Sequence, residues 1–213
     1  MQQYKTYFVD KKFITSFFFG LILLALSLVT QFFVTGYVNK TASVPVTDII
    51  LSNTNVHNVG DIFVWGSVIL AFIGIILCLK NIKYTPFLSK SIAVFTLIRA
   101  VFVSLTHISP FPTHVIINSV FFNKEAFTGI FNGNDLFFSG HTGVPFLLAL
   151  IFWKNKVLRI IFLCFSFMFA AVVLLGHLHY SIDVLSAYFI TFSIFHICVF
   201  IFKKDWETLN SPE

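Results

Sequence analysis

Long apolar stretches alternate along the chain with short polar or turn-rich segments. Each stretch approaches the ~20 residues that a helix needs to cross a bilayer. Six of them lie at about 13–36, 62–79, 91–108, 137–153, 157–175 and 180–202. The pattern predicts an all-α fold, a polytopic bundle of six transmembrane helices that forms a single membrane domain over residues 1–213. The first stretch lacks a small-residue cleavage site, so we expect it to be retained as a helix and not removed as a signal peptide.

Composition supports a membrane protein. Of the 213 residues, 57% are hydrophobic and 11% are charged. A soluble domain of this size has too small an interior to bury that much apolar surface. We therefore expect the bilayer to be the main partner of the chain.

The basic residues orient the predicted bundle. Eleven lie on one side of a six-span topology, namely Lys5, Lys11, Lys12, Lys80, Lys83, Lys90, Lys154, Lys156, Arg159, Lys203 and Lys204. Lys40 and Lys124 fall on the other side. The positive-inside rule then predicts that both termini are cytoplasmic. The net charge of +5 comes from clusters beside helix ends, a pattern that favours anionic lipid and does not predict a nucleic-acid partner.

Six of the seven histidines fall in the non-cytoplasmic half of this topology. They are His57, His107, His114, His141, His177 and His179. Ionisable side chains at membrane depth usually face a bundle interior or a wet cavity, so this end of the bundle is the predicted working end. We interpret His57, His107 and His114 as ordinary loop residues.

The segment NDLFFSGHT places Asp135, Ser139, Gly140 and His141 where the fourth apolar stretch begins. Ser139 is a candidate N-cap, and the N–H groups behind it form an anion site that glycine lets a phosphate approach closely. His141 would lie beside the bound anion. The alternative is a capped helix whose histidine lies in the head-group region without a chemical role.

The segment GHLHYSIDVLSAY opens the last apolar stretch. His179 and Asp183 are four residues apart, so on a helix they share a face and the carboxylate can accept a hydrogen bond from one ring nitrogen. The other ring nitrogen is then unprotonated and nucleophilic. A purely structural His–Asp pair is the alternative.

Arg99 is the arginine that falls in the middle of a predicted span. A guanidinium at that depth needs a partner, and a lipid phosphate in a polar cavity is one candidate. An internal ion pair with Asp135 or Asp183 is the other.

Two blocks together resemble the signature blocks of sphingomyelin synthases and ceramide phosphoethanolamine synthases, a branch of the type 2 phosphatidic acid phosphatase superfamily. They consist of Asp135, Ser139, Gly140, His141 and Thr142, and of His179 to Val184 with Tyr188. Arg99 with Thr106, and Pro45 to Asp48, resemble parts of two further blocks. Phe138 and Val173 stand where the wider superfamily typically has proline and arginine, which favours the synthase branch.

The resemblance implies a lipid phosphotransferase with a phospholipid donor and a lipid alcohol acceptor such as ceramide. His179, oriented by Asp183, would form a phosphohistidine, and His141 would act as the acid and then the base. Arg99, Ser139 and Gly140 would bind the phosphoryl group, and the resemblance adds Asp135 and Tyr180 to the substrate-binding residues. It implies no cofactor and no metal. The site would face the non-cytoplasmic side, which is the periplasm if the source is bacterial.

Three alternatives remain open at this stage. With water as the acceptor, the same three residues give a lipid phosphatase or a phospholipase C-type hydrolase. A metalloenzyme would use His141, His177, His179, Asp135 and Asp183 as ligands. A transporter or scaffold would need none of the histidines for its function.

Overall fold

The computed structural model describes residues 7–41, 43–117 and 136–211, which form helices and connecting loops with no strand. The long helices are α2 (Lys11–Thr41), α3 (Gly60–Lys80), α4 (Thr85–Leu105), α6 (Gly140–Ile151), α7 (Lys156–Leu175) and α8 (Ser181–Ile201). Three short helices join or follow them: η1 (Leu51–Asn53), η2 (Ile82–Tyr84) and α9 (Lys203–Leu209). The prediction of an all-α fold is confirmed for the described residues.

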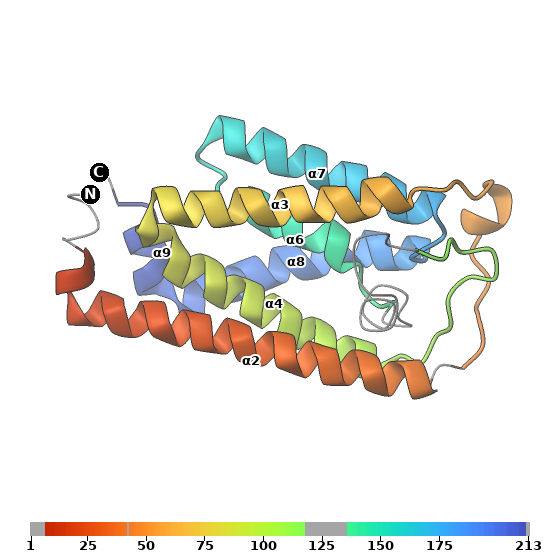
Figure 1. Ribbon diagram of the computed structural model, residues 1–213, viewed down its shortest axis with the longest axis horizontal. Coiled ribbons are helices and arrows are strands. Elements are labelled where there is room, and N and C mark those ends of the chain that lie inside the picture. The colour runs from red at the N-terminus through yellow and green to blue at the C-terminus, as the bar shows by residue number, and fades with distance from the viewer. Residues whose placement is uncertain (1–6, 42, 118–135, 212–213) are drawn as a thin grey trace.

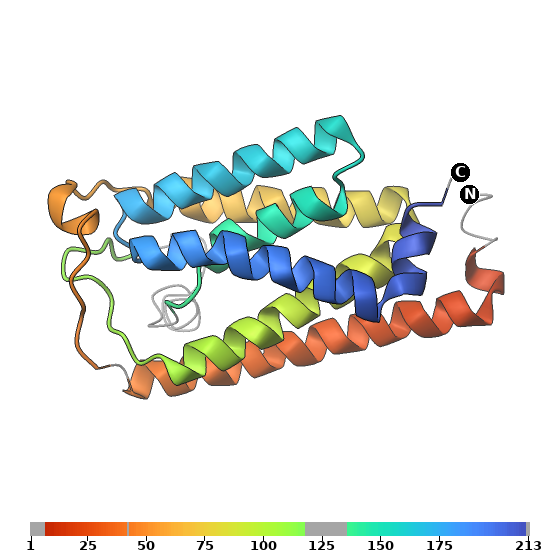
Figure 2. The ribbon, with the colours of Figure 1, turned by 180° about the vertical axis from the view of Figure 1, so that it is seen from behind.

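The long helices run lengthwise through one elongated bundle (Figure 1). Helix α2 packs along α4, helix α6 packs against α7 and α8, and α3 packs on α7. The view from behind shows the first turn of α2 and all of α9 at the same end of the bundle (Figure 2). The loops that follow α2 and α4 lie together at the opposite end.

Five helices are long and apolar enough to cross a membrane: α2, α3, α7, α8 and the segment Ile82–Leu105 that contains α4. They indicate an integral, multi-pass membrane protein. The fourth predicted span, 137–153, contains a helix of only 12 residues, α6. At 1.5 Å per residue α6 is ~18 Å long, shorter than the ~30 Å hydrocarbon core. Six complete spans are therefore not confirmed.

Helix α6 lies in the centre of the bundle and is wrapped by the other helices. Its Gly143 allows this close packing, because a Cβ atom there would lie 2.8 Å from the ring of Phe95 on α4 and 2.8 Å from Thr191 Oγ1 on α8. The fully buried rings of Phe95, Phe138 and Phe169 belong to the core that surrounds α6. The first turn of α6 is thus held from several sides.

At the end of the bundle where α2 begins, an ion pair between Lys90 and Asp205 joins α9 to α4. Lys90 Nζ lies 2.6 Å from Asp205 Oδ2 and donates to Ser16 Oγ at 2.6 Å. Lys90 is only 4% exposed. Helix α4 begins at Thr85, earlier than the predicted 91, because this partner allows a lysine to be buried in its second turn.

Candidate active site

Ser139 caps the N-terminus of α6, as the sequence predicts. Its Oγ accepts a hydrogen bond from the Thr142 N–H at 3.4 Å, and its carbonyl accepts one from the Gly143 N–H at 3.0 Å. Gly140 is the first residue of the helix and His141 the second. The N-terminus of a helix carries partial positive charge and exposed N–H groups, which suit a bound anion.

Arg99 reaches from α4 to the start of α6. Its Nε donates to the carbonyl of Phe138 at 2.9 Å. A Cβ atom on Gly140 would lie 3.3 Å from Arg99 Nε, so the absence of a side chain allows the arginine to lie close to this first turn. The role of Gly140 in letting a phosphate approach stays a prediction; the structure shows that its missing side chain makes room for Arg99. A cationic side chain and a helix N-terminus therefore meet at one point.

His179 lies in the turn before α8, because that helix begins at Ser181. The expectation that His179 and Asp183 share a helix face is therefore wrong. They meet because Asp183 folds back in a capping box: its Oδ2 accepts from the Tyr180 N–H at 2.9 Å and lies 3.4 Å from His179 Nδ1. Asp183 is 1% exposed and lies behind the histidine.

The closest acceptor for His179 is a backbone carbonyl. Nδ1 lies 2.9 Å from the carbonyl oxygen of Leu136, which is nearer than Asp183. A carbonyl oxygen can only accept, so Nδ1 carries the proton and the neutral ring keeps a lone pair on Nε2. This is the tautomer that the sequence predicts, but the carbonyl of Leu136, just before α6, is its main cause.

Backbone contacts join the two histidine segments. The Ser139 N–H donates to the carbonyl of Asp183 at 3.1 Å. In addition, Nδ1 of His179 donates to the carbonyl of Leu136. The segment that caps α6 and the segment that begins α8 therefore hold each other in register. Residues about 40 positions apart in sequence thus form one rigid unit.

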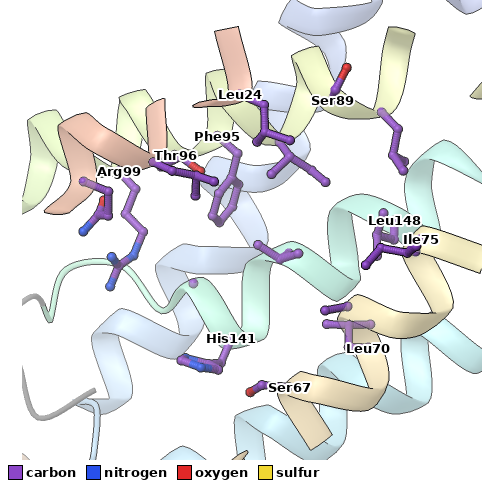
Figure 3. Close-up of a pocket in the computed structure, with 18 of the residues that line it drawn as sticks. Leu24, Ser67, Leu70, Ile75, Ser89, Phe95, Thr96, Arg99, His141 and Leu148 are labelled. Carbon is purple, nitrogen blue, oxygen red and sulfur yellow. The ribbon is translucent and has the colours of Figure 1, made fainter. Parts of the chain in front are cut away.

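A cavity of about 760 Å³ lies between α3 on one side and α2 and α4 on the other. His141, His179, Arg99 and Gly140 all line it, and most of its remaining wall is apolar. His141 is close enough to His179 and Arg99 for their charges to act on its ring, which packs on Phe63 with centroids 4.0 Å apart. Figure 3 shows Arg99 and His141 at one end of the cavity, with Ser89 and Ile75 towards the other.

The loop after α2 closes this end of the bundle through Asp48. Its Oδ2 accepts from the N–H and the hydroxyl of Ser181 at 2.7 and 2.8 Å, and its Oδ1 accepts from the N–H groups of Ile50 and Leu51 at 2.8 and 3.1 Å. Burial alone would raise the pKa of Asp48, but these donors lower it below its usual value. An ionised carboxylate thus covers the N-terminus of α8.

Tyr180, which the sequence analysis placed among the substrate-binding residues, is 2% exposed and ties two loops together. Its hydroxyl donates to the carbonyl of Ser109 at 2.8 Å and accepts from the Val46 N–H at 3.2 Å. Tyr180 is not among the residues that line the cavity in the described part of the chain. Asp135, the other residue that the resemblance added to the substrate-binding residues, lies outside the described residues.

His177 is not among the described residues that line the cavity. Its ring nitrogens lie 2.6 Å from Thr113 Oγ1 and 3.3 Å from Thr54 Oγ1, so it joins the two loops that cover this end. Burial lowers its pKa. Within residues 7–41, 43–117 and 136–211, no three His, Cys, Asp or Glu side chains gather as metal ligands would.

His114 was interpreted as an ordinary loop residue, yet it lines the cavity together with His141 and His179. Its Nδ1 bonds to the carbonyl of Phe111 at 2.8 Å, which again leaves Nε2 unprotonated in the neutral ring. No local motif marks His114. Its place becomes visible only when the loop after α4 folds over the bundle.

Residues 132–200 match the family described as "PAP2 superfamily C-terminal". The matched range contains both histidine segments, all of α6 and α7, and α8 except its last residue. The match supports the type 2 phosphatidic acid phosphatase superfamily and fits a lipid phosphatase or phosphotransferase in general. No curated protein and no solved structure matches the chain.

Proposed function

We propose that this protein is a membrane enzyme that transfers the phosphate-linked head group of a phospholipid to a lipid alcohol such as ceramide, through a phosphohistidine. One observation carries the proposal: the imidazoles of His141 and His179 and the guanidinium of Arg99, with His114 as a third histidine, line a cavity whose walls are otherwise mostly apolar. A lipid phosphate ester has the same two parts, an anionic group joined to a hydrocarbon.

In the first step, His179 Nε2 attacks the phosphorus of the donor. A P–N bond forms, the P–O bond to the diacylglycerol oxygen breaks, and His141 gives its proton to that oxygen. Arg99 and the N–H groups at the start of α6 neutralise the charge on the phosphoryl oxygens. Asp183 and the carbonyl of Leu136 hold His179 in the tautomer that can attack.

In the second step, the hydroxyl of the acceptor attacks the same phosphorus while His141 takes its proton. The P–N bond breaks, which restores neutral His179 and the protonated His141. Because diacylglycerol leaves before the acceptor binds, one cavity serves both lipids in turn.

The proposed site faces the non-cytoplasmic side of the membrane. Lys80 ends α3, Lys156 begins α7, Lys203 begins α9 and Lys154 lies in the turn between α6 and α7, all at the opposite end of the bundle. The positive-inside rule assigns that opposite end to the cytoplasm.

Hydrolysis is the second candidate, and the superfamily match favours it as much as transfer. Water would then attack the phosphohistidine in place of the lipid alcohol. The chemistry of the two histidines is the same in both reactions, so the acceptor decides between them.

The test uses purified full-length protein with a fluorescent phospholipid, in the presence and absence of ceramide or diacylglycerol. Transfer predicts a new head-group-bearing lipid that forms only with the acceptor, whereas hydrolysis predicts free head-group phosphate in both samples. His141→Ala and His179→Ala should each lower the rate by at least ~10²-fold. His57→Ala is the matched control, since His57 is exposed at the same end of the bundle.

Trapping separates the roles of the two histidines. A donor labelled in its phosphate should leave an alkali-stable label on wild-type protein and none on His179→Ala. Label on His179→Ala, or full activity of that variant, would refute the assignment.

A further inference from the structure

The cavity extends far beyond the reactive residues, along α2, α3 and α4. On α2 the lining residues are three or four positions apart, and on α3 and α4 single residues or adjacent pairs recur at this spacing, so a single face of each helix lines the space. The stripes include Leu21, Leu24 and Leu28 on α2, Leu70, Gly74 and Cys78 on α3, and Leu88, Ser89 and Ile92 on α4. The cavity is therefore a long channel with the histidines at one end, and it is open to the surroundings of the bundle where Leu28, Ile75 and Leu79 are exposed.

The depth of the channel follows from helix geometry. Phe63 packs on the His141 ring, and Gly74 lies 11 positions further along α3, or ~16 Å at 1.5 Å per residue. One leaflet of the hydrocarbon core is about half of 30 Å. The channel continues past Gly74 to Cys78 and Leu79, ~24 Å from Phe63. The distance from Phe63 to the far end of the channel is thus greater than the thickness of one leaflet of the hydrocarbon core.

The walls of the deep part suit a hydrocarbon. Ser89 faces the channel, but its hydroxyl donates to the carbonyl of Thr85 at 2.7 Å, within its own helix. Ser67 does the same with the carbonyl of Phe63 at 2.7 Å. Hydroxyls that are satisfied in this way do not demand a polar ligand. Leucine, isoleucine and glycine form most of the remaining wall.

Gly74 keeps the channel open halfway along. A Cβ atom built on Gly74 meets no other atom within 4 Å, so close packing against the protein does not require glycine here. Glycine in the middle of a helix costs ~1 kcal/mol relative to alanine. A side chain at this position would instead project into the space that the channel occupies.

We infer that the channel holds one hydrocarbon tail of the lipid substrate, that this tail is longer than a single leaflet, and that Gly74 determines the length accepted. The inference rests on the proposed function, since the phosphate of the same lipid would lie at His141 and His179. Because the phosphate is held at the histidines, the distance from the histidines to the far end of the channel limits the length of the tail.

The experiment compares wild type, Gly74→Phe and Gly36→Phe with octyl, dodecyl and octadecyl phosphate as single-tailed probes. Gly36 is the matched control, because it is an exposed glycine of α2, does not line the channel and also has open space around a Cβ atom. Turnover and the rise in thermal unfolding temperature on probe binding are both measured. Gly74→Leu repeats the test with a smaller side chain if Gly74→Phe does not fold.

We expect wild type and Gly36→Phe to prefer octadecyl phosphate. We expect Gly74→Phe to lose at least ~10-fold with that probe and to keep its activity with octyl phosphate. The same tail preference in all three proteins would overturn the inference and leave the proposed function intact. If wild type turns over no probe, cleavage of these phosphate monoesters is excluded, and the proposed head-group transfer is judged by its own assay with a phospholipid donor. The thermal shifts then decide the channel alone: the inference holds if octadecyl phosphate stabilises wild type but not Gly74→Phe, and fails if it stabilises both or neither.

Discussion

Replacing Asp183 with asparagine tests which group fixes the tautomer of His179. Where a carboxylate is the sole group that holds a catalytic histidine, the amide replacement costs about 10⁴-fold because the wrong ring nitrogen becomes protonated. Here the carbonyl of Leu136, at 2.9 Å from Nδ1, is closer than Asp183 at 3.4 Å. The carbonyl is unchanged in Asp183→Asn, so we expect the tautomer to persist and the loss to be small.

The expected loss follows from two contacts. The bond from the Tyr180 N–H, at 2.9 Å, changes from a charged to a neutral acceptor, a difference of ~1 kcal/mol. The long contact with His179 loses the attraction between the carboxylate and the positive charge that develops on the ring, which adds about 1 kcal/mol. The first change lowers the free energy of unfolding; the second acts on the transition state and predicts a fall in kcat of about 5-fold.

The assay is the initial rate of head-group transfer or release by purified protein, with the thermal unfolding temperature measured in parallel. Asp61→Asn is the matched control, since Asp61 is an exposed acid in the first turn of α3. It should leave both quantities unchanged. A loss near 10⁴-fold in a stably folded Asp183→Asn protein would show that Asp183 alone sets the tautomer, and no loss at all would show that it is not coupled to the reaction.

Three further predictions concern the parts that hold the site. Asp48→Asn should lower the free energy of unfolding by about 2 kcal/mol, because two charge-assisted bonds to Ser181 are weakened; thermal unfolding measures this. Lys90→Ala should cost about 3 kcal/mol, because Asp205 loses its cation but stays partly exposed and keeps its hydrogen bond from Ser16, and combining it with Asp205→Ala should recover part of that loss. Burial lowers the pKa of His177 in the folded state below 6.5, so its contribution is present above the unfolded-state value and is lost as pH falls from about 6.5; His177→Gln should flatten the pH dependence of thermal stability.

Each of these three predictions has a control variant or a result that would contradict it. Lys203→Ala removes the exposed pair with Glu207, 3.9 Å long, and should change stability by under ~0.5 kcal/mol. An equal effect of Lys90→Ala would contradict the role of burial. If Asp48→Asn were as stable as wild type, the loop after α2 would not depend on this carboxylate. If His177→Gln kept the full pH dependence, other groups would be responsible for it.

Local patterns in the sequence predicted the helices and the cap well. Apolar stretches mark α3, α7 and α8 to within a few residues, and Ser139 precedes α6 as an N-cap should. Contacts that join distant segments were not predictable in this way. The carbonyl of Leu136 carries no side-chain signal, although it is the nearest partner of His179.

The pattern of basic residues predicted the orientation of the helices in the membrane, but it did not predict which residues form ion pairs. Lys90 reads as one more flanking lysine, whereas its role depends on Asp205, 115 positions later. Helix α9, which carries that aspartate, follows the last predicted span and has no apolar stretch of its own. The length of α6 was also overestimated, because the apolar residues that flank it belong to non-helical chain ends that are buried by tertiary packing, such as Phe138 and Phe152.

The channel between α3 and α4 has a practical consequence for handling the protein. Extraction from the bilayer replaces lipids with surfactants, and a surfactant with a long straight alkyl chain and a small anionic head resembles the proposed substrate. Such a molecule would occupy the channel during purification and compete in every kinetic measurement. Bulky sterol-based or short-chain surfactants, or a native lipid disc, are the better choice for the experiments above.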